Sequence, residues 1–218
     1  MKCKIMSKKG FFITGTDTGV GKTFFASILM KKYNFDYWKP IQTGKFTEND
    51  TLYIKQNIGI EKNRFHEPIY SFKKPLSPHL ASRYEKISIS IKKIKKPNTI
   101  KPLIIEGAGG VLVPLNKKNL IIDLIKKFRL PVIIVSKSIL GTINHTLMTL
   151  EILKKNKIKV FGVVLNNVKN KKEGNDNAKS IETFGKIKVL TQISSVNPIT
   201  KKRIEILSKK EFINVFKI

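Results

Sequence analysis

Hydrophobic residues along the chain form short, nearly continuous runs that alternate with longer stretches in which polar residues are interspersed. Continuous β-branched runs, such as PVIIV at 131–135, are typical of parallel strands covered on both faces. The longer mixed stretches have helical spacing, and Asn49-Asp50 is a plausible N-cap for one of them. The pattern predicts strands starting at residue 10 and at 37–39, 102–106, 131–135, 160–165 and 186–190, and helices at 22–33, 50–57, 120–128, 142–156, 175–184 and 200–216.

This alternation predicts one doubly wound α/β domain over residues 1–218, with a mostly parallel sheet and helices on both faces. The first nine residues are expected to form a poorly ordered lead-in. Residues 40–44 are expected to be a loop, and the proline-rich residues 67–79 a loop with at most a brief strand. The basic amphipathic stretch 88–101 is expected to form an outer helix broken by Pro97.

The stretch GFFITGTDTGVGKT at 10–23 combines an apolar run, a glycine-bearing loop and a helix that begins at Lys22. Glycines let backbone N–H groups turn onto phosphate oxygens, and the helix N-terminus adds partial positive charge. Lys22 can reach the β- and γ-phosphates, and the Thr23 hydroxyl can bind Mg²⁺. Five residues separate Gly15 from Gly21, where a general Walker A motif has four, and Thr16 takes the usual glycine place. The order of elements favours a P-loop of the NTPase type over a glycine-rich turn without a ligand.

Ligands of doubly wound proteins bind at the carboxyl ends of the strands. Glu106 stands at such an end beside glycines in a chain with only fifteen acidic residues, which suggests a ligand contact, although a cap or surface carboxylate is the alternative. Asp50 can equally be a plain helix cap, and Lys39 an ordinary surface lysine. With Thr23, the two carboxylates could complete a Mg²⁺ sphere that keeps several waters. The loops expected to meet at this edge are 15–23, 39–44, 106–110, 136–141 and 166–167.

The formal net charge is +28, which raises the question of a nucleic-acid or membrane partner. Lysines occur in pairs and short runs almost everywhere, which favours a solvated background over a specific nucleic-acid site, with some polyanion affinity left open. Cys3 is the only cysteine, so an intrachain disulfide and a cysteine-cluster metal site are excluded. No apolar run approaches the ~20 residues of a membrane span, and the N-terminus has no apolar signal region. A cytoplasmic location without a membrane partner is the resulting expectation.

Five motifs in order along residues 10–195 resemble dethiobiotin synthetase: GTDTGVGKT at 15–23, WKPIQTG at 38–44, SPH at 77–79, EGAGG at 106–110 and LGTINHTL at 140–147. That family shares the longer spacing in the phosphate loop. The resemblance implies an enzyme that closes a ureido ring. In the family reaction 7,8-diaminopelargonate takes up CO₂ as a carbamate, the carbamate attacks the γ-phosphate of ATP, and the second amine expels phosphate.

The resemblance also implies site residues. Lys22 and Lys39 would be catalytic, and Thr23, Asp50 and Glu106 would hold Mg²⁺. Substrate would contact Thr18, Thr43, Gly141, Thr142 and Asn144. ATP and its metal would contact Gly19, Val20, Gly21, Lys22, Thr23, Phe24, Asp50, Glu106, Gly107, Ala108, Gly109, Asn166, Asn167, Ile193, Ser194 and Ser195. Within the base-binding part, Asn167 stands where many relatives carry aspartate, and residues 191–195 lack the usual Gly-x-x-Pro pattern.

Two other classes stay open. A partition-type ATPase that binds DNA or a membrane would suit the charge, but such proteins carry a second lysine five residues before the Walker lysine, where this chain has Asp17. A related amidoligase acting on another acid is the second alternative.

The helix predicted at 142–156 bears on quaternary structure. Ile143, Leu147, Leu150 and Leu153 form one apolar stripe that can pack on the sheet, whereas Met148 and Ile152 fall on the opposite side. A second apolar patch suggests a subunit contact, with surface scatter as the alternative. The resemblance implies a homodimer in which the start of this helix holds the substrate carboxylate of the neighbouring subunit.

Overall fold

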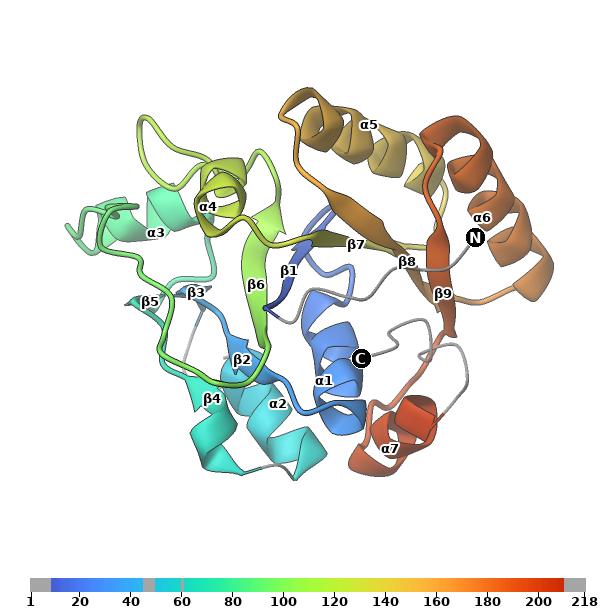
Figure 1. Ribbon diagram of the computed structural model, residues 1–218, viewed down its shortest axis with the longest axis horizontal. Coiled ribbons are helices and arrows are strands. Elements are labelled where there is room, and N and C mark those ends of the chain that lie inside the picture. The colour runs from blue at the N-terminus through green and yellow to red at the C-terminus, as the bar shows by residue number, and fades with distance from the viewer. Residues whose placement is uncertain (1–8, 45–49, 60, 210–218) are drawn as a thin grey trace.

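The computed structural model describes residues 9–44, 50–59 and 61–209. Predictions that concern residues 1–8, Cys3, Asn49 and the tail beyond residue 209 lie outside these residues. Seven strands form one parallel sheet in the order β4-β2-β6-β1-β7-β8-β9 (Figure 1). Its strands are β1 (Gly10–Gly15), β2 (Asp36–Trp38), β4 (Phe65–His66), β6 (Leu103–Gly110), β7 (Val132–Lys137), β8 (Val160–Val168) and β9 (Val189–Ser194).

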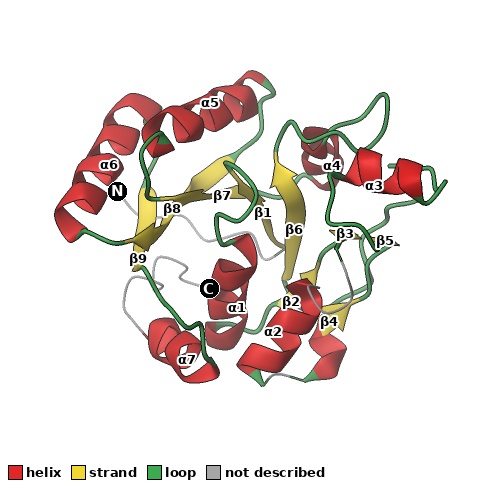
Figure 2. Ribbon diagram, turned by 180° about the vertical axis from the view of Figure 1, so that it is seen from behind, coloured by secondary structure: helices red, strands yellow, loops and turns green. Residues whose placement is uncertain are grey.

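Helices cover both faces of this sheet (Figure 2). One face packs on α1 (Lys22–Lys32), α2 (Asp50–Ile58) and α7 (Lys201–Lys209), and the other on α4 (Ile121–Phe128), α5 (Thr142–Lys155) and α6 (Lys171–Gly185). In β1 the side chains of Phe11 and Ile13 enter one core and Phe12 enters the other. Burial on both faces therefore explains the continuous apolar runs, and the doubly wound α/β prediction is confirmed.

Several boundaries differ from the sequence prediction. Residues 40–44 are not simply a loop, because β3 (Ile41–Thr43) pairs in parallel with β5 (Tyr70–Phe72) in a separate two-stranded sheet. The proline-rich stretch contains β5 and the start of α3 (Pro78–Tyr84), whose first helical residue is a proline. α6 begins at Lys171 because the Asn170 side chain caps it, accepting hydrogen bonds from two backbone N–H groups. A short 3-10 helix, η2 (Lys62–Arg64), precedes β4.

The expected outer helix at 88–101 is wrong. That stretch contains turns and irregular chain. Ile89 and Ile94 are buried in the core, and the Lys127 ammonium group at the end of α4 donates hydrogen bonds to the backbone carbonyls of Ile91 and Lys92. Burial of two isoleucines and hydrogen bonds from α4 therefore hold this stretch in place without a helix.

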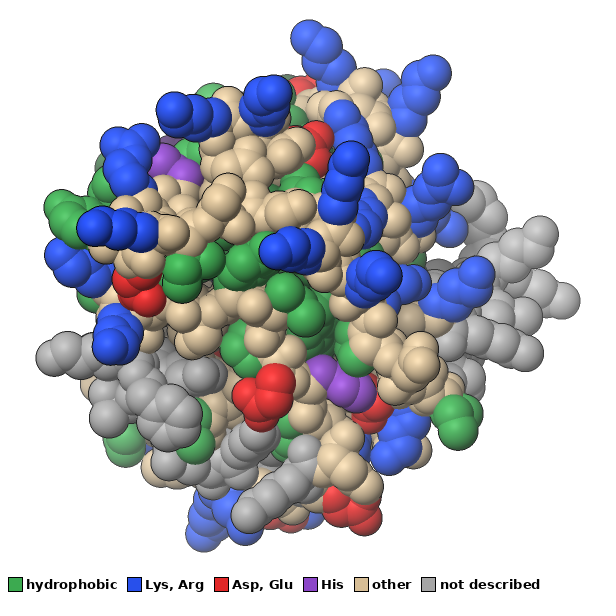
Figure 3. Space-filling model, turned by 90° about the vertical axis from the view of Figure 1, so that its left-hand side faces the viewer, with side chains coloured by type: hydrophobic (Ala, Val, Ile, Leu, Met, Phe, Trp, Pro, Cys, Tyr) green, Lys and Arg blue, Asp and Glu red, His purple; other side chains and the backbone are tan. Residues whose placement is uncertain are grey.

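Lysine and arginine side chains are spread over the upper part and edges of the face shown in Figure 3, as a solvated basic surface would be. None of the helices that the structure describes combines the length and the apolar character of a membrane span.

Candidate functional site

The phosphate loop joins β1 to α1 at the carboxyl edge of the sheet. Gly21 is the N-cap of α1 with φ 96°, a left-handed conformation that favours glycine. A Cβ on Gly21 would lie 2.0 Å from the Asn166 amide nitrogen, which donates a 2.9 Å hydrogen bond to the Val20 carbonyl. The end of β8 therefore contacts the loop directly, and only glycine fits between them.

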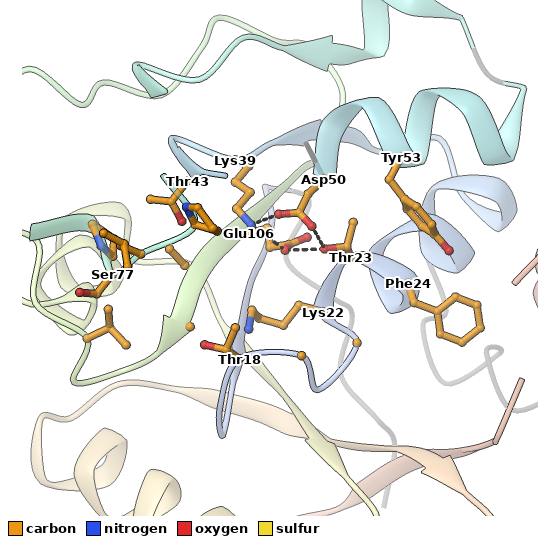
Figure 4. A pocket seen from close by; sticks show the side chains of 18 of the residues that line it. Thr18, Lys22, Thr23, Phe24, Lys39, Thr43, Asp50, Tyr53, Ser77 and Glu106 are labelled. Atoms are coloured by element: carbon orange, nitrogen blue, oxygen red, sulfur yellow. Dashed lines mark hydrogen bonds and ion pairs between the residues drawn. The ribbon is translucent and has the colours of Figure 1, made fainter. Parts of the chain in front are cut away.

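Lys22 is buried on the first turn of α1. Its ammonium group donates a 3.0 Å hydrogen bond to the Asp17 backbone carbonyl, and the side chain points along the loop toward Thr18 (Figure 4). Burial lowers the pKa of Lys22 to about 8, although the negative charge of Glu106 opposes this shift. No acidic residue occupies the first turn of α1, so the loop is suited to an anion.

Four side chains from four segments converge beside this lysine (Figure 4). The Thr23 hydroxyl lies 2.7 Å from Asp50 Oδ1 and 2.8 Å from Glu106 Oε1. Lys39 Nζ forms an ion pair with Asp50 Oδ2 and lies 3.4 Å from Glu106 Oε1. Lys39 and the predicted Mg²⁺ ligands Thr23, Asp50 and Glu106 therefore form one contiguous cluster.

Sheet register explains why two of these residues meet. Trp38 on β2 pairs with Ile105 on β6, so Lys39 and Glu106 are the next residues along two adjacent parallel strands. Asp50 is the first residue of α2, and it faces the cluster rather than serving only as a helix end.

Burial and charge act in opposite directions on these groups. Burial raises the pKa of Glu106, and this effect prevails over the opposing charge of Lys39. Burial also disfavours the charged forms of Lys39 and Asp50, but opposite charges prevail at both groups. The negative charges of Glu106 and Asp50 raise the pKa of Lys39, and the positive charge of Lys39 lowers the pKa of Asp50. Burial raises the pKa of the Tyr37 phenol, and the charges of Glu106 and Asp50 raise it further.

The donor set fits a hard divalent cation that keeps water ligands. Thr23, Asp50 and Glu106 offer a hydroxyl and two carboxylates whose oxygens lie within 2.8 Å of the hydroxyl. The described residues contain no group of three or more His, Cys, Asp or Glu placed to enclose a metal. A hydroxyl and two carboxylates suit Mg²⁺, which uses one or two carboxylates together with substrate phosphates rather than an all-protein cage.

A cavity of about 600 Å³ opens over the cluster. Among the predicted residues that line it are Thr18, Gly19, Gly21, Lys22, Thr23, Phe24, Lys39, Thr43, Asp50, Glu106, Ala108 and Gly109. Sequence reasoning gave no role to Tyr53, Ser77 and Ile199, which also line it. The SPH motif was the available signal for Ser77, whereas Tyr53 and Ile199 reach the cavity only through the packing of α2 and the segment before α7.

Other predicted residues lie outside that cavity. The Val20 side chain and Ile193 are buried in the core. A Cβ on Gly107 would touch the core residue Phe12. Ser194 and Ser195 line a separate cavity of about 370 Å³. Asn167 has φ 59°.

The predicted residues at the start of α5 line a third cavity of about 770 Å³, apart from the phosphate loop. Gly141 and Asn144 are exposed there, whereas Thr142 is buried and its hydroxyl lies 2.8 Å from that of Ser136. Along α5, Leu150 and Leu153 are fully buried and Met148 is exposed, as the helical pattern predicted. Ile152 is only partly buried but packs against the same core, so assigning it to the opposite side was wrong.

Comparisons with known proteins agree with the motifs. A family model described as an AAA domain matches residues 9–203. An ATP-dependent dethiobiotin synthetase from Paramagnetospirillum magneticum is 43% identical over 88% of this chain and 91% of that protein. One from Lawsonia intracellularis is 45% identical over 88% of this chain and 90% of that protein. This chain belongs to the dethiobiotin synthetase family.

A third relative is a biotin biosynthesis bifunctional protein from Bordetella avium. It is 40% identical over 93% of this chain, and the match spans 43% of that longer protein. Among solved structures, a ParA family ATPase from Chlorobium tepidum has a TM-score of 0.55 at 12% identity, with 97% of this chain and 100% of that chain covered. That likeness concerns the fold alone, so it does not favour the partition-type alternative, and the sequence relatives decide the family.

Proposed function

We propose that this enzyme forms dethiobiotin from 7,8-diaminopelargonate, CO₂ and ATP through a carbamate and a carbamic-phosphoric anhydride. One amine takes up CO₂, a carbamate oxygen attacks the γ-phosphate and releases ADP, and the second amine attacks the carbonyl carbon and displaces phosphate. The observation that carries this proposal is the convergence of Lys22 and Lys39 on one cavity beside the phosphate loop.

The two lysines suit different parts of this reaction. Lys22 lies on the loop and would neutralise charge on the β- and γ-phosphates. Lys39 comes from the neighbouring strand end and would offset charge on the carbamate and the transferred phosphoryl group. Phosphoryl transfer depends mainly on positioning and electrostatic stabilisation, so two fixed cations from separate elements fit the task.

Thr23, Asp50 and Glu106 would hold Mg²⁺, which when bound neutralises phosphate charge during transfer. Thr18 and Thr43 line the cavity and offer hydroxyl groups to the nitrogen end of the substrate. Asn166 would contact adenine near the phosphate loop, to which its amide nitrogen is already bonded. Ser194, Ser195 and Asn167 remain candidates for the base.

The direct test is ATP hydrolysis measured with and without diaminopelargonate and bicarbonate, with mass detection of the product. We expect ADP release that depends on both substrates and a product that retains the carbon of labelled bicarbonate. Substrate-independent ATP turnover stimulated by DNA or vesicles would favour a partition-type ATPase. ATP use that depends on a different acid would favour the amidoligase alternative.

ATP binding should take up a proton at about pH 8, because burial lowers the pKa of Lys22 to about 8 in the free protein. Phosphates favour the ammonium form, so the pKa of Lys22 must be higher in the complex than in the free protein. At a pH between the pKa of Lys22 in the free protein and its pKa in the complex, the free protein holds fewer protons than the complex. ATP affinity therefore falls as the pH rises above about 8.

Calorimetry of ATP binding in two buffers with different ionisation enthalpies measures this uptake. The arginine in Lys22→Arg keeps its charge throughout this pH range, so this variant should bind ATP without taking up a proton. Equal heats in both buffers for the unsubstituted enzyme would contradict the assignment.

We further propose a homodimer in which each α5 start faces the active site of the partner. Leu140, Met148 and Phe184 are large apolar side chains exposed near or along α5, as a subunit contact requires. Gly141 caps the helix, whose first turn carries no acidic residue, so its N–H groups suit a carboxylate. An extended apolar substrate with one charged end needs such a remote anchor to hold its amines in place.

Asn144→Glu should raise KM for the diamine by about 10-fold or more, because it places a negative charge where the substrate carboxylate binds. ATP affinity should stay nearly unchanged. Asn144→Gln is the neutral control. Equilibrium sedimentation should show a dimer for all three proteins, and a fully active monomer or an unchanged diamine KM in Asn144→Glu would refute the shared site.

A further inference from the structure

Tyr37 lies on β2 directly behind the cluster of Thr23, Asp50, Glu106 and Lys39. Its side chain is fully buried, and its hydroxyl donates a 2.9 Å hydrogen bond to Glu106 Oε2. The other carboxylate oxygen, Oε1, lies 2.8 Å from the Thr23 hydroxyl and 3.4 Å from Lys39 Nζ. The two oxygens of Glu106 thus have different partners: Oε2 bonds to the protein core, and Oε1 faces the cluster.

Strand register brings the phenol to this position. Tyr37 pairs with Ile104 on β6, and Glu106 lies two residues further along that strand on the same face. A long aromatic side chain can reach such a diagonal neighbour. Tyr37 and Ile104 both pack in the core that α1 covers, and the Tyr37 ring meets Phe65 edge to face. Phenylalanine would supply that packing equally well, so the hydroxyl is the part of the side chain directed at Glu106.

The other hydrogen-bond donors near Glu106 are shared with Asp50, so they do not fix the orientation of the Glu106 carboxylate. Thr23 has one hydroxyl proton and lies within hydrogen-bond distance of both Asp50 and Glu106, so it can donate to only one of them at a time. Lys39 is likewise shared between the two carboxylates. The Tyr37 hydroxyl is a donor that holds Oε2 without engaging Oε1.

We propose that Tyr37 is a positioning residue that orients Glu106 so that Oε1 is presented to a divalent cation. The proposal rests on the proposed Mg²⁺ site and adds to it a residue that touches neither nucleotide nor metal. Outer partners of metal ligands orient those ligands, and their loss typically costs about 10–100-fold in metal affinity.

The test is Mn²⁺ binding to the ADP complex, which is measured through the electron paramagnetic resonance signal of the Mn²⁺ that remains free. Tyr37→Phe should weaken Mn²⁺ binding by about 10-fold, with ADP binding in the absence of metal unchanged. Tyr70→Phe is the matched control: it removes a phenol that accepts a hydrogen bond from the Ser90 backbone, away from the cluster, and should bind Mn²⁺ normally. In turnover assays Tyr37→Phe should need about 10-fold more Mg²⁺ for half-maximal rate.

Non-natural side chains at position 37 separate orientation from packing. A 4-methylphenylalanine fills the space of the hydroxyl without a donor and should behave as Tyr37→Phe, which keeps the test open if the smaller ring destabilises the fold. A 4-aminophenylalanine restores a donor and should recover most of the Mn²⁺ affinity. In a Glu106→Gln background, Tyr37→Phe should cause no further loss.

Unchanged Mn²⁺ affinity in Tyr37→Phe, or equal loss in the two non-natural variants, would overturn the positioning role. Mn²⁺ and ADP binding need no diamine, so this outcome is independent of whether the unsubstituted enzyme makes dethiobiotin.

Discussion

Lys22→Ala should lower kcat/KM for ATP by at least about 100-fold, the scale of losing one preorganised charge donor. The side chain is buried at the start of α1 and its ammonium is held by the Asp17 carbonyl, so water cannot readily replace it. Its loss removes a positive charge from the phosphate loop and also one of the cations that offset Glu106. We therefore expect both weaker ATP binding and slower turnover.

Isothermal titration with ATP and steady-state kinetics measure the two effects separately. Lys31→Ala removes a lysine from the last turn of the same helix and serves as the matched control. Circular dichroism should show that both variants fold. A Lys22→Ala enzyme that keeps near-normal kcat/KM would remove the phosphate-loop assignment.

The sequence predicted the parts of the fold that depend on local pattern. β1, β7 and β8 are continuous apolar runs, and burial on both faces makes such runs recognisable without any knowledge of their neighbours. The pairing of β3 with β5 could not be predicted, because both segments are short and their composition does not indicate which strand each one pairs with. The stretch at 88–101 misled for the converse reason: its local amphipathic pattern is real, but two buried isoleucines anchor it to the core without a helix.

The candidate site divides in the same way. Lys39, Glu106 and the phosphate loop follow from strand ends of a parallel sheet, a rule that needs only the order of elements. Tyr37 was missed because an apolar strand gives no sign that one of its aromatic hydroxyls meets Glu106 on the next strand. Asn166 was predicted as a base contact, whereas its bond to Val20 depends on the close approach of β8 and Gly21.

Lys39 differs from the other lysines of this basic chain in its surroundings. It is buried, and burial alone would lower its pKa, but Glu106 and Asp50 keep the ammonium charged. A charged group held in place before the reaction stabilises developing charge without reorganisation. Lys39→Met preserves most of the aliphatic volume and should lower kcat by at least about 100-fold, with a much smaller change in ATP affinity. An equal fall in kcat and kcat/KM would mark an interaction made chiefly in the transition state.

Removing this cation also leaves the buried carboxylate of Glu106 close to the partly buried carboxylate of Asp50, so folding must be measured alongside activity. Thermal unfolding with ADP and Mg²⁺ present separates the two effects, because a variant that is folded and saturated with nucleotide but slow has lost catalysis rather than structure. Lys126→Ala, an exposed lysine on α4, is the matched control and should keep the normal rate. Lys39→Met with kcat within about twofold of that control would place Lys39 among the ordinary lysines. The stabilisation of transferred charge would then depend on Lys22 alone.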